Sequence, residues 1–386
     1  MADIFDYVKK YGSFRFNEMG ISDIDNAVFS RLAYLDFSGY AGKTLGEISE
    51  EYEIPADDNK ATADTVALLK AVGKSIRFGY TAVYNCVEIL SEDLANAFYA
   101  VTFATDADTF FIAFRGTDDK IVSFYEDAEL AYSFPISSQT SALCYVTEEL
   151  EERKGKFFLG GHSKGGNLAL FAYLFLRDEE KERIIRVYNN DGPGFPEDIA
   201  NILFTRKNSE KIVNILPEDS IIGRMLTIGG KTKIVKSTAA GVSQHNIFTW
   251  VTSAAEFART EKFSLLSEYM EDTLTQSLDT LPPEKMKAAA TAVFEIAKKS
   301  GIGSLKDISI KNYKSLIPAI LRMKTLVDDK DDEIPVIVRT LAKSLVDSIS
   351  VEKMIDYSMP DFKNKIDSLT DKIKESKLHT NEDETT

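Results

Sequence analysis

Residues 161–165, Gly-His-Ser-Lys-Gly, have the G-x-S-x-G spacing of a nucleophile elbow. A short apolar run, 157–159, precedes them, and 167–174 is typical of a helix. In a sharp strand-to-helix turn the serine is strained, and its hydroxyl projects at the helix N-terminus, where backbone N–H groups stabilise an oxyanion. The pattern therefore makes Ser163 a candidate nucleophile. The non-catalytic alternative is a glycine-rich turn whose serine caps the helix.

A serine nucleophile needs a general base, and the chain contains three histidines. His162 lies within the elbow, where the tight turn directs neighbouring side chains away from the serine hydroxyl. His379 lies in the charged C-terminal tail. By elimination, His245, in a loop beyond the last strand-like run, is the predicted base.

The acid that orients the imidazole is expected between Ser163 and His245 in the chain. Asp191 and the pair Glu218 and Asp219 each follow a predicted strand. Asp219 is preferred, because its strand is the nearest in sequence to the His245 loop. Asp191 and Glu218 remain alternative acids. The non-catalytic alternatives are a turn residue for Asp191 and a helix cap for Asp219.

Two backbone donors are needed for an oxyanion hole. The residue after the nucleophile, Lys164, supplies one N–H. The apolar run 111–114 ends in a tight polar turn, from which Thr117 offers its N–H and its hydroxyl. Arg115 in the same turn is expected to form a structural ion pair, with Asp127 as a nearby candidate partner.

Hydrophobic spacing indicates which elements hold these residues. Residues 1 to about 75 are predicted to be mostly helical, and a polar connection between two β-rich runs predicts a hairpin. The predicted helices are 25–36, 65–73 and 138–154, and the predicted strands are 98–103, 109–114, 184–188 and 211–215. Strands that alternate with helices imply a mostly parallel central sheet flanked by helices, with functional groups at the carboxyl ends of its strands.

The last third of the chain is expected to be an added helical region without strands. A helix that starts at Pro282-Pro283 is predicted to run through Lys298, and others are predicted at 309–328, 334–349 and 361–376. The expected organisation is an N-terminal helical segment packed on the core (1–75), an α/β core (76–260), a helical appendage (261–376) and a disordered tail (377–386).

Composition narrows the class of protein. A net charge of −15 argues against binding to nucleic acids or to anionic membranes. The only cysteines, Cys86 and Cys144, indicate neither a disulfide framework nor a metal site. No secretory signal or transmembrane segment is recognised, so a cytoplasmic location is expected, and no cofactor or metal is called for.

The combination of motifs resembles the class 3 lipase family, whose fold is the α/β-hydrolase fold. More closely, it is similar to a bacterial lipase-like family of unknown function (Mbeg-like), over roughly residues 1–250. The segments that carry the resemblance are 114–117, 161–167, 190–195 and 244–245. The resemblance implies Ser163 as nucleophile, Asp219 as acid, His245 as base, and Thr117 with Lys164 as oxyanion donors.

Lys164 departs from the class 3 pattern, which has an apolar residue at this position. Its side chain is expected either to contact an anionic group of the substrate or to pair with Asp191 or another acid. No apolar lid is evident after Thr117, although residues 121–125 could cover part of the site.

The sequence thus predicts a serine hydrolase that cleaves a carboxylic or acyl ester of a small or lipid-like molecule through an acyl-enzyme. One alternative is a catalytically idle hydrolase-fold protein that binds or regulates a partner, with the C-terminal helices as the surface for a partner or for self-association. Another is a thioesterase that uses the same three residues.

Overall fold

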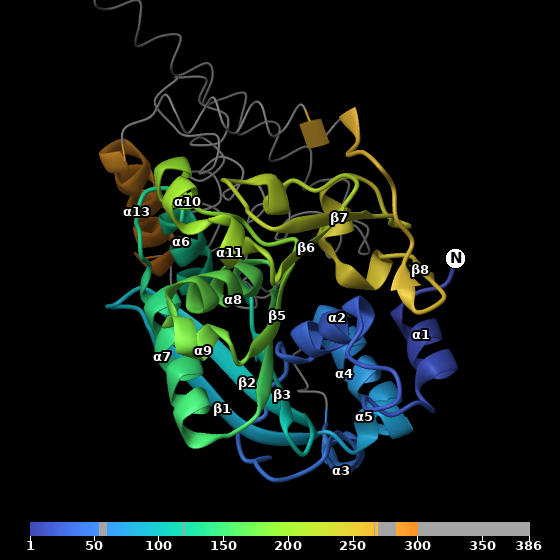
Figure 1. Ribbon diagram of the computed structural model, residues 1–386. Coiled ribbons are helices and arrows are strands. Elements are labelled where there is room, and N and C mark those ends of the chain that lie inside the picture. Colours follow the sequence, from blue (N-terminus) through green and yellow to red (C-terminus); the bar gives the residue numbers. More distant parts are fainter. Residues whose placement is uncertain (54–59, 119, 266, 269–282, 300–386) are drawn as a thin grey trace, which may run out of the picture.

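A seven-stranded sheet forms the centre of the molecule (Figure 1). The computed structural model describes residues 1–53, 60–118, 120–265, 267–268 and 283–299. The strands lie in the sheet in their chain order: β1 (Ala82–Ser91), β2 (Asn96–Asp106), β3 (Thr109–Phe114), β4 (Lys156–His162), β5 (Ile184–Asn190), β6 (Ile212–Pro217) and β7 (Lys231–Val235). The first three strands pair antiparallel, and β3 to β7 pair parallel.

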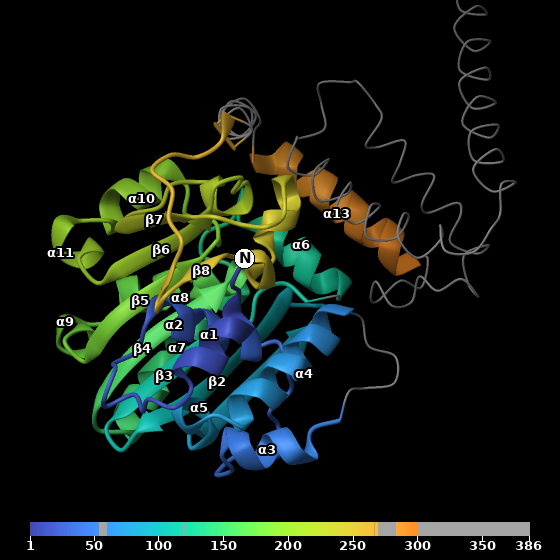
Figure 2. The same cartoon turned by 90° about the vertical axis from the view of Figure 1, so that its right-hand side faces the viewer.

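Helices cover both faces of the sheet (Figures 1 and 2). The N-terminal helices lie on one face: α1 (Ile4–Tyr11), α2 (Asp23–Leu32), α3 (Leu45–Glu51), α4 (Lys60–Gly73) and α5 (Ile76–Gly79). The other face carries α7 (Ser137–Glu152) and α8 (Lys164–Phe175), and short helices follow: α9 (Asp178–Lys181), α10 (Glu197–Leu203) and α11 (Arg206–Ser209). This is the α/β-hydrolase architecture that the sequence predicts.

Alternating side chains of the central strands build a separate core on each face. On β2, Tyr99, Val101 and Phe103 join the core under the N-terminal helices, whereas Phe98 and Ala100 join the core under α7 and α8. Both sets are buried, because successive residues of a strand point to opposite faces and helices cover each face.

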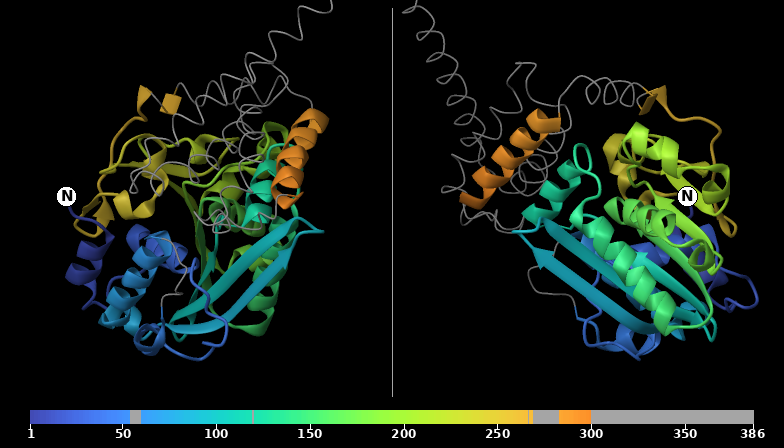
Figure 3. Two further views of the ribbon diagram at one scale, coloured as in Figure 1. Left: turned by 180° about the vertical axis from the view of Figure 1, so that it is seen from behind. Right: turned by 60° about the vertical axis from the view of Figure 1, so that its left-hand side comes forward.

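Two strands of the central sheet were not predicted from the sequence, and both lie at its edges. The hairpin of β1 and β2 forms one edge (Figure 3), where Tyr84 and Leu90 of β1 are exposed. At the opposite edge, β7 exposes Lys231 and Thr232. Edge strands are half-solvated, so their sequences lack the continuous apolar run by which a buried strand is recognised.

Short elements follow β6 and β7 in the chain. They are three turns of 3-10 helix, η1 (Ile222–Arg224), η2 (Gly241–His245) and η3 (Ile247–Thr249), and a small antiparallel pair, β8 (Thr252–Ser253) with β9 (Glu256–Phe257). The sequence shows no strand signal beyond about residue 251, so this one pair was not predicted.

Helix α13 (Pro283–Lys299) is present where the alanine-rich segment predicted it. It lies alongside α6 (Ile121–Glu129), the helix that follows the Thr117 turn (Figure 2). The rings of Tyr125 and Phe294 are 4.7 Å apart, and the Tyr125 hydroxyl is 3.2 Å from Thr291 Oγ1. The predicted helices 309–328, 334–349 and 361–376 and the tail lie outside the described residues, and the division into domains stays a prediction.

Candidate active site

Ser163 has the strained backbone that an elbow requires. It lies between β4 and α8 with φ +59° and ψ −133°, a backbone conformation that residues other than glycine rarely adopt. Its N–H donates to the carbonyl oxygen of Asn190 on β5 (3.0 Å). Its side chain makes no capping hydrogen bond to α8. Ser163 thus occupies the N-cap position of α8, but its hydroxyl does not cap the helix.

The glycines of the elbow allow three pieces of backbone to meet. A Cβ on Gly161 would lie 2.2 Å from the carbonyl oxygen of Gly165, and one on Gly165 would lie 2.2 Å from that of Phe114. Real Cβ atoms do not approach so closely, so α8 can start against β3 and β4 only with glycine at these positions.

His245 pairs with Asp191. Its Nδ1 lies 2.7 Å from Asp191 Oδ2. The Asp191 side chain is 1% exposed, and that of His245 is 27% exposed. The other carboxylate oxygen of Asp191 accepts hydrogen bonds from Ser220 Oγ (2.5 Å) and from the N–H of Gly223 (3.1 Å). The carboxylate is thus fixed on both oxygens and directs one of them at the imidazole.

This pairing corrects the preference for Asp219. Asp219 Oδ2 accepts from the N–H of Gly241 (2.6 Å) and from Gln244 Nε2 (2.8 Å), so it holds the η2 segment and not the imidazole. Glu218 lies beside β7, where its N–H donates to the carbonyl of Val235 (3.0 Å).

The order of the strands explains the correction. β5 lies next to β4, whereas β6 is one strand further from the nucleophile. Asp191 directly follows Asn190, the residue bonded to Ser163 N–H. Nearness in sequence to the His245 loop favoured Asp219, but nearness in the sheet to Ser163 favours Asp191.

The turn after β3 contacts the nucleophile. A Cβ on Gly116 would lie 3.0 Å from that of Ser163, which places Thr117 beside the elbow. The Thr117 hydroxyl donates to Asp127 Oδ2 on α6 (2.5 Å). Burial raises the pKa of Asp127 to about 6, although the nearby Lys164 ammonium opposes this shift.

Arg115 does not pair with Asp127, contrary to the expectation from the sequence. Its guanidinium binds Glu88 (2.6 Å) and lies 3.5 Å from Asp118. It also lies over the ring of Tyr99, 4.5 Å from its centroid. Arg115 therefore anchors the start of the turn to β1 and β2.

Lys164 forms a buried ion pair. Its Nζ lies 2.7 Å from Glu126 Oε2, and the two side chains are 1% and 0% exposed. Burial alone lowers the pKa of Lys164, but Glu126 and Asp127 reverse this effect and raise it above its ordinary value. The side chain joins α8 to α6, so its partner is an acid other than Asp191.

Sequence reasoning missed the contribution of α2. Asn26 and Asn190 exchange side-chain hydrogen bonds (2.8 and 3.1 Å), and Asn190 Nδ2 also donates to the carbonyl oxygen of Gly161 (3.0 Å). This buried amide pair ties the strand end next to Asp191 to the elbow. The two asparagines that precede Asp191 were the available signal, because unpaired amides are costly inside a core.

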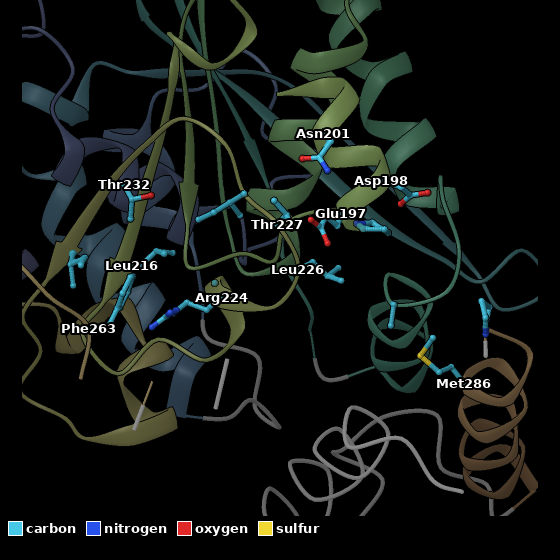
Figure 4. A pocket seen from close by; sticks show the side chains of 16 residues that line it. Glu197, Asp198, Asn201, Leu216, Arg224, Leu226, Thr227, Thr232, Phe263 and Met286 are labelled. Atoms are coloured by element: carbon cyan, nitrogen blue, oxygen red, sulfur yellow. The ribbon is translucent and has the colours of Figure 1, made fainter. Parts of the chain in front are cut away.

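A cavity of about 1050 Å³ (Figure 4) is connected to the candidate site through one lining residue. Gly223, which binds Asp191, forms part of its wall, with Leu216, Leu226 and Phe263 among the apolar lining. Met286 of α13 lines the opposite side.

Two features are absent from the part of the chain that the structure describes. None of its helices combines the length and the apolar composition that a bilayer crossing requires. No group of three or more histidine, cysteine, aspartate or glutamate side chains within it could hold a metal ion.

Comparisons with solved structures find fungal lipases. The chain matches a Rhizomucor miehei lipase propeptide complex (TM-score 0.35, 18% identity, 56% of this chain and 68% of that one). It also matches a variant of MDLA from Penicillium cyclopium (TM-score 0.39, 11% identity, 63% and 87%) and lipase II from Rhizopus niveus (TM-score 0.31, 13% identity, 53% and 76%).

A search of curated protein sequences finds no match. The family model described as Mbeg1-like matches residues 72–295, more than half of the chain. The matched residues include the elbow, Asp191 and His245. The chain belongs to the Mbeg1-like family.

Proposed function

We propose that this protein is a serine hydrolase that cleaves a carboxylic or acyl ester through an acyl-enzyme. Ser163 is the nucleophile, His245 the general base and Asp191 the acid. The N–H groups of Lys164 and Thr117 are the oxyanion donors. The single observation that carries the proposal is the 2.7 Å contact of a buried carboxylate with His245 Nδ1, beside a serine held at φ +59°.

The chemistry follows from this arrangement. His245 Nε2 takes the proton of the Ser163 hydroxyl as its oxygen attacks the acyl carbon, and Asp191 stabilises the imidazolium that forms. The negative charge that develops on the acyl oxygen is stabilised by the two backbone N–H groups. His245 then returns the proton to the departing alcohol. A water molecule, deprotonated by the same histidine, releases the acid and restores Ser163.

The cavity beside Asp191 is the candidate place for the acyl chain. Leu216, Leu226 and Phe263 offer such a chain apolar contacts, next to the charged groups of Glu197, Asp198 and Arg224. The cavity also shares Gly223 with the hydrogen bonds of the acid. A panel of p-nitrophenyl esters from acetyl to dodecanoyl, with matched thioesters, measures the preference. The cavity predicts that kcat/KM rises from acetyl to chains of intermediate length.

Labelling with a fluorophosphonate probe tests the nucleophile. Wild-type protein should be modified at Ser163, and Ser163→Ala protein should not be modified. Ser243→Ala is a matched control, because Ser243 is exposed on η2, next but one to His245. This control should label as the wild type does.

Folded wild-type protein that neither labels nor hydrolyses any ester of the panel refutes the proposal. That result would favour the rival function, a hydrolase fold used only to bind a partner. The C-terminal region is then the first place to seek the binding surface.

A further inference from the structure

His162, the residue before the nucleophile, is buried at the end of β4 and faces the N-terminal helices. Its Nε2 lies 2.7 Å from the backbone carbonyl oxygen of His245, and its Nδ1 lies 3.1 Å from the Tyr34 hydroxyl. The two imidazole rings are 4.4 Å apart and inclined by 35°. One buried ring thus contacts both the candidate base and the segment that follows α2.

These contacts define the protonation state of His162. A carbonyl oxygen only accepts hydrogen bonds, so Nε2 must carry a hydrogen and donate it to His245. Nδ1 then accepts from the Tyr34 hydroxyl. Burial lowers the pKa of His162 well below its usual range, and the neighbouring His245 and Arg31 lower it further. His162 is therefore a neutral Nε2–H imidazole.

We propose that His162 is a positioning residue for His245. Its Nε2–H holds the backbone carbonyl of His245, while Asp191 holds Nδ1 of the same residue. Fixing His245 at both its main chain and its ring sets where its free Nε2 lies relative to Ser163. This role rests on the proposed hydrolase function.

The N-terminal segment supports the contact. Tyr34 binds His162 Nδ1, and the Arg31 guanidinium lies over the Tyr34 ring, 4.3 Å from its centroid. Arg31 is itself buried and donates to Thr65 Oγ1 (3.0 Å). The position of the base is thus coupled to the helices on the opposite side of the sheet from α8. An apolar residue before Ser163 would fill the same space without this hydrogen bond.

Two substitutions separate the hydrogen bond from mere packing. A glutamine side chain carries its amide nitrogen about where imidazole carries Nε2, whereas asparagine reaches only as far as Nδ1. His162→Asn should therefore lower kcat/KM for ester hydrolysis about 10- to 100-fold, almost entirely in kcat, as a small misplacement of the base would. His162→Gln should regain at least about a tenth of wild-type activity, well above the asparagine variant. KM should change less than about twofold in both.

Spectroscopy of the wild-type protein provides a measurement independent of these variants. With only three histidines in the chain, long-range ¹H–¹⁵N spectra are assignable by removing them singly. His162 should appear at pH 7 as the neutral Nε2–H tautomer. In His162→Asn, the Nδ1–H resonance of His245 should shift or broaden, and in His162→Gln it should stay near its wild-type position.

The outcomes are distinguishable. If Ser163 of the wild type is not labelled, the proposed function fails. If labelling is normal but both variants keep wild-type kcat, or lose it equally while folded, the positioning role fails. If neither variant folds, the wild-type spectrum decides: a charged His162 or an Nδ1–H tautomer overturns the proposal, and the neutral Nε2–H tautomer supports it.

Discussion

Replacing Asp191 by asparagine is the sharpest test of the site. An asparagine keeps one oxygen for Ser220 and Gly223, so the buried hydrogen bonds to Asp191 Oδ1 survive. Its amide nitrogen, however, replaces the oxygen that lies 2.7 Å from His245 Nδ1. Nδ1 then has to accept a hydrogen bond, the ring hydrogen moves to Nε2, and the base can no longer take the Ser163 proton.

The expected loss is large, because both the tautomer and the stabilisation of the imidazolium are lost. Asp191 is 1% exposed, so solvent does not replace its charge. The same substitution in a serine protease triad lowers kcat about 10⁴-fold, and we expect a similar loss here. That factor corresponds to about 5 kcal/mol of transition-state stabilisation. The assay is kcat for the best ester of the panel, together with the rate of fluorophosphonate labelling.

Asp219→Asn is the matched control, since it makes the same chemical change on the neighbouring loop. An asparagine oxygen can still accept from Gly241 and Gln244, so the η2 segment keeps its shape. We expect kcat to fall less than about tenfold. If Asp219→Asn lost about 10⁴-fold and Asp191→Asn stayed within tenfold of wild type, the assignment of the acid would be refuted.

Two further predictions concern the helix that follows the Thr117 turn. Lys164→Met leaves the Glu126 carboxylate buried without its cation, so it should lower the free energy of unfolding by about 3–5 kcal/mol. Adding Glu126→Gln removes the unpaired charge and should recover most of that loss. Urea unfolding of the single and double variants measures both effects. Folding raises the pKa of Asp127 from 3.8 to about 6, so the folded protein holds this proton more tightly than the unfolded chain does. The resulting stabilisation is fully present below pH 4 and is lost as the pH rises through 6. Asp127→Asn keeps an acceptor for the Thr117 hydroxyl and removes this titration, so relative to wild type it should gain up to about 3 kcal/mol in the free energy of unfolding between pH 4 and pH 7.5. A difference between Asp127→Asn and wild type that is constant over this pH range would contradict the reasoning.

The buried strands could be predicted from the sequence because burial on both faces gives a strand a continuous apolar run. β3 was predicted with its observed bounds, Thr109–Phe114, and this apolar run is buried on both faces of the sheet. β5 was predicted two residues too short, because it ends in Asn189 and Asn190. These amides are buried in hydrogen bonds that an isolated sequence does not reveal. In the edge strand β1, Asn85 and Glu88 interrupt the apolar residues, and β7 alternates lysines with other residues, so neither strand was recognised.

The elbow at Ser163 and the pairing of His245 with a carboxylate were predictable for a different reason. An elbow is a local motif, since its geometry is set within a few residues around Ser163, and the histidines were few enough for elimination. The acid is a tertiary property. Both Asp191 and Asp219 follow strands, and only the order of the strands in the sheet decides which of them reaches His245. The Lys164–Glu126 pair was undecided for the same reason, because it joins two helices.

The N-terminal helices have a second role besides covering the sheet. A Cβ on Gly160 would lie 2.6 Å from Asn26 Oδ1, so α2 packs directly on the strand that carries the elbow. From this contact α2 and the turn after it reach the site at two points, through Asn26 to the strand end before Asp191 and through Tyr34 to His162. Both links are polar and lie in a largely apolar core, where an amide or imidazole is tolerated only if it is fully hydrogen-bonded. Such groups accept few alternative arrangements. The same contacts that satisfy them therefore also fix where the acid and the base stand relative to the serine.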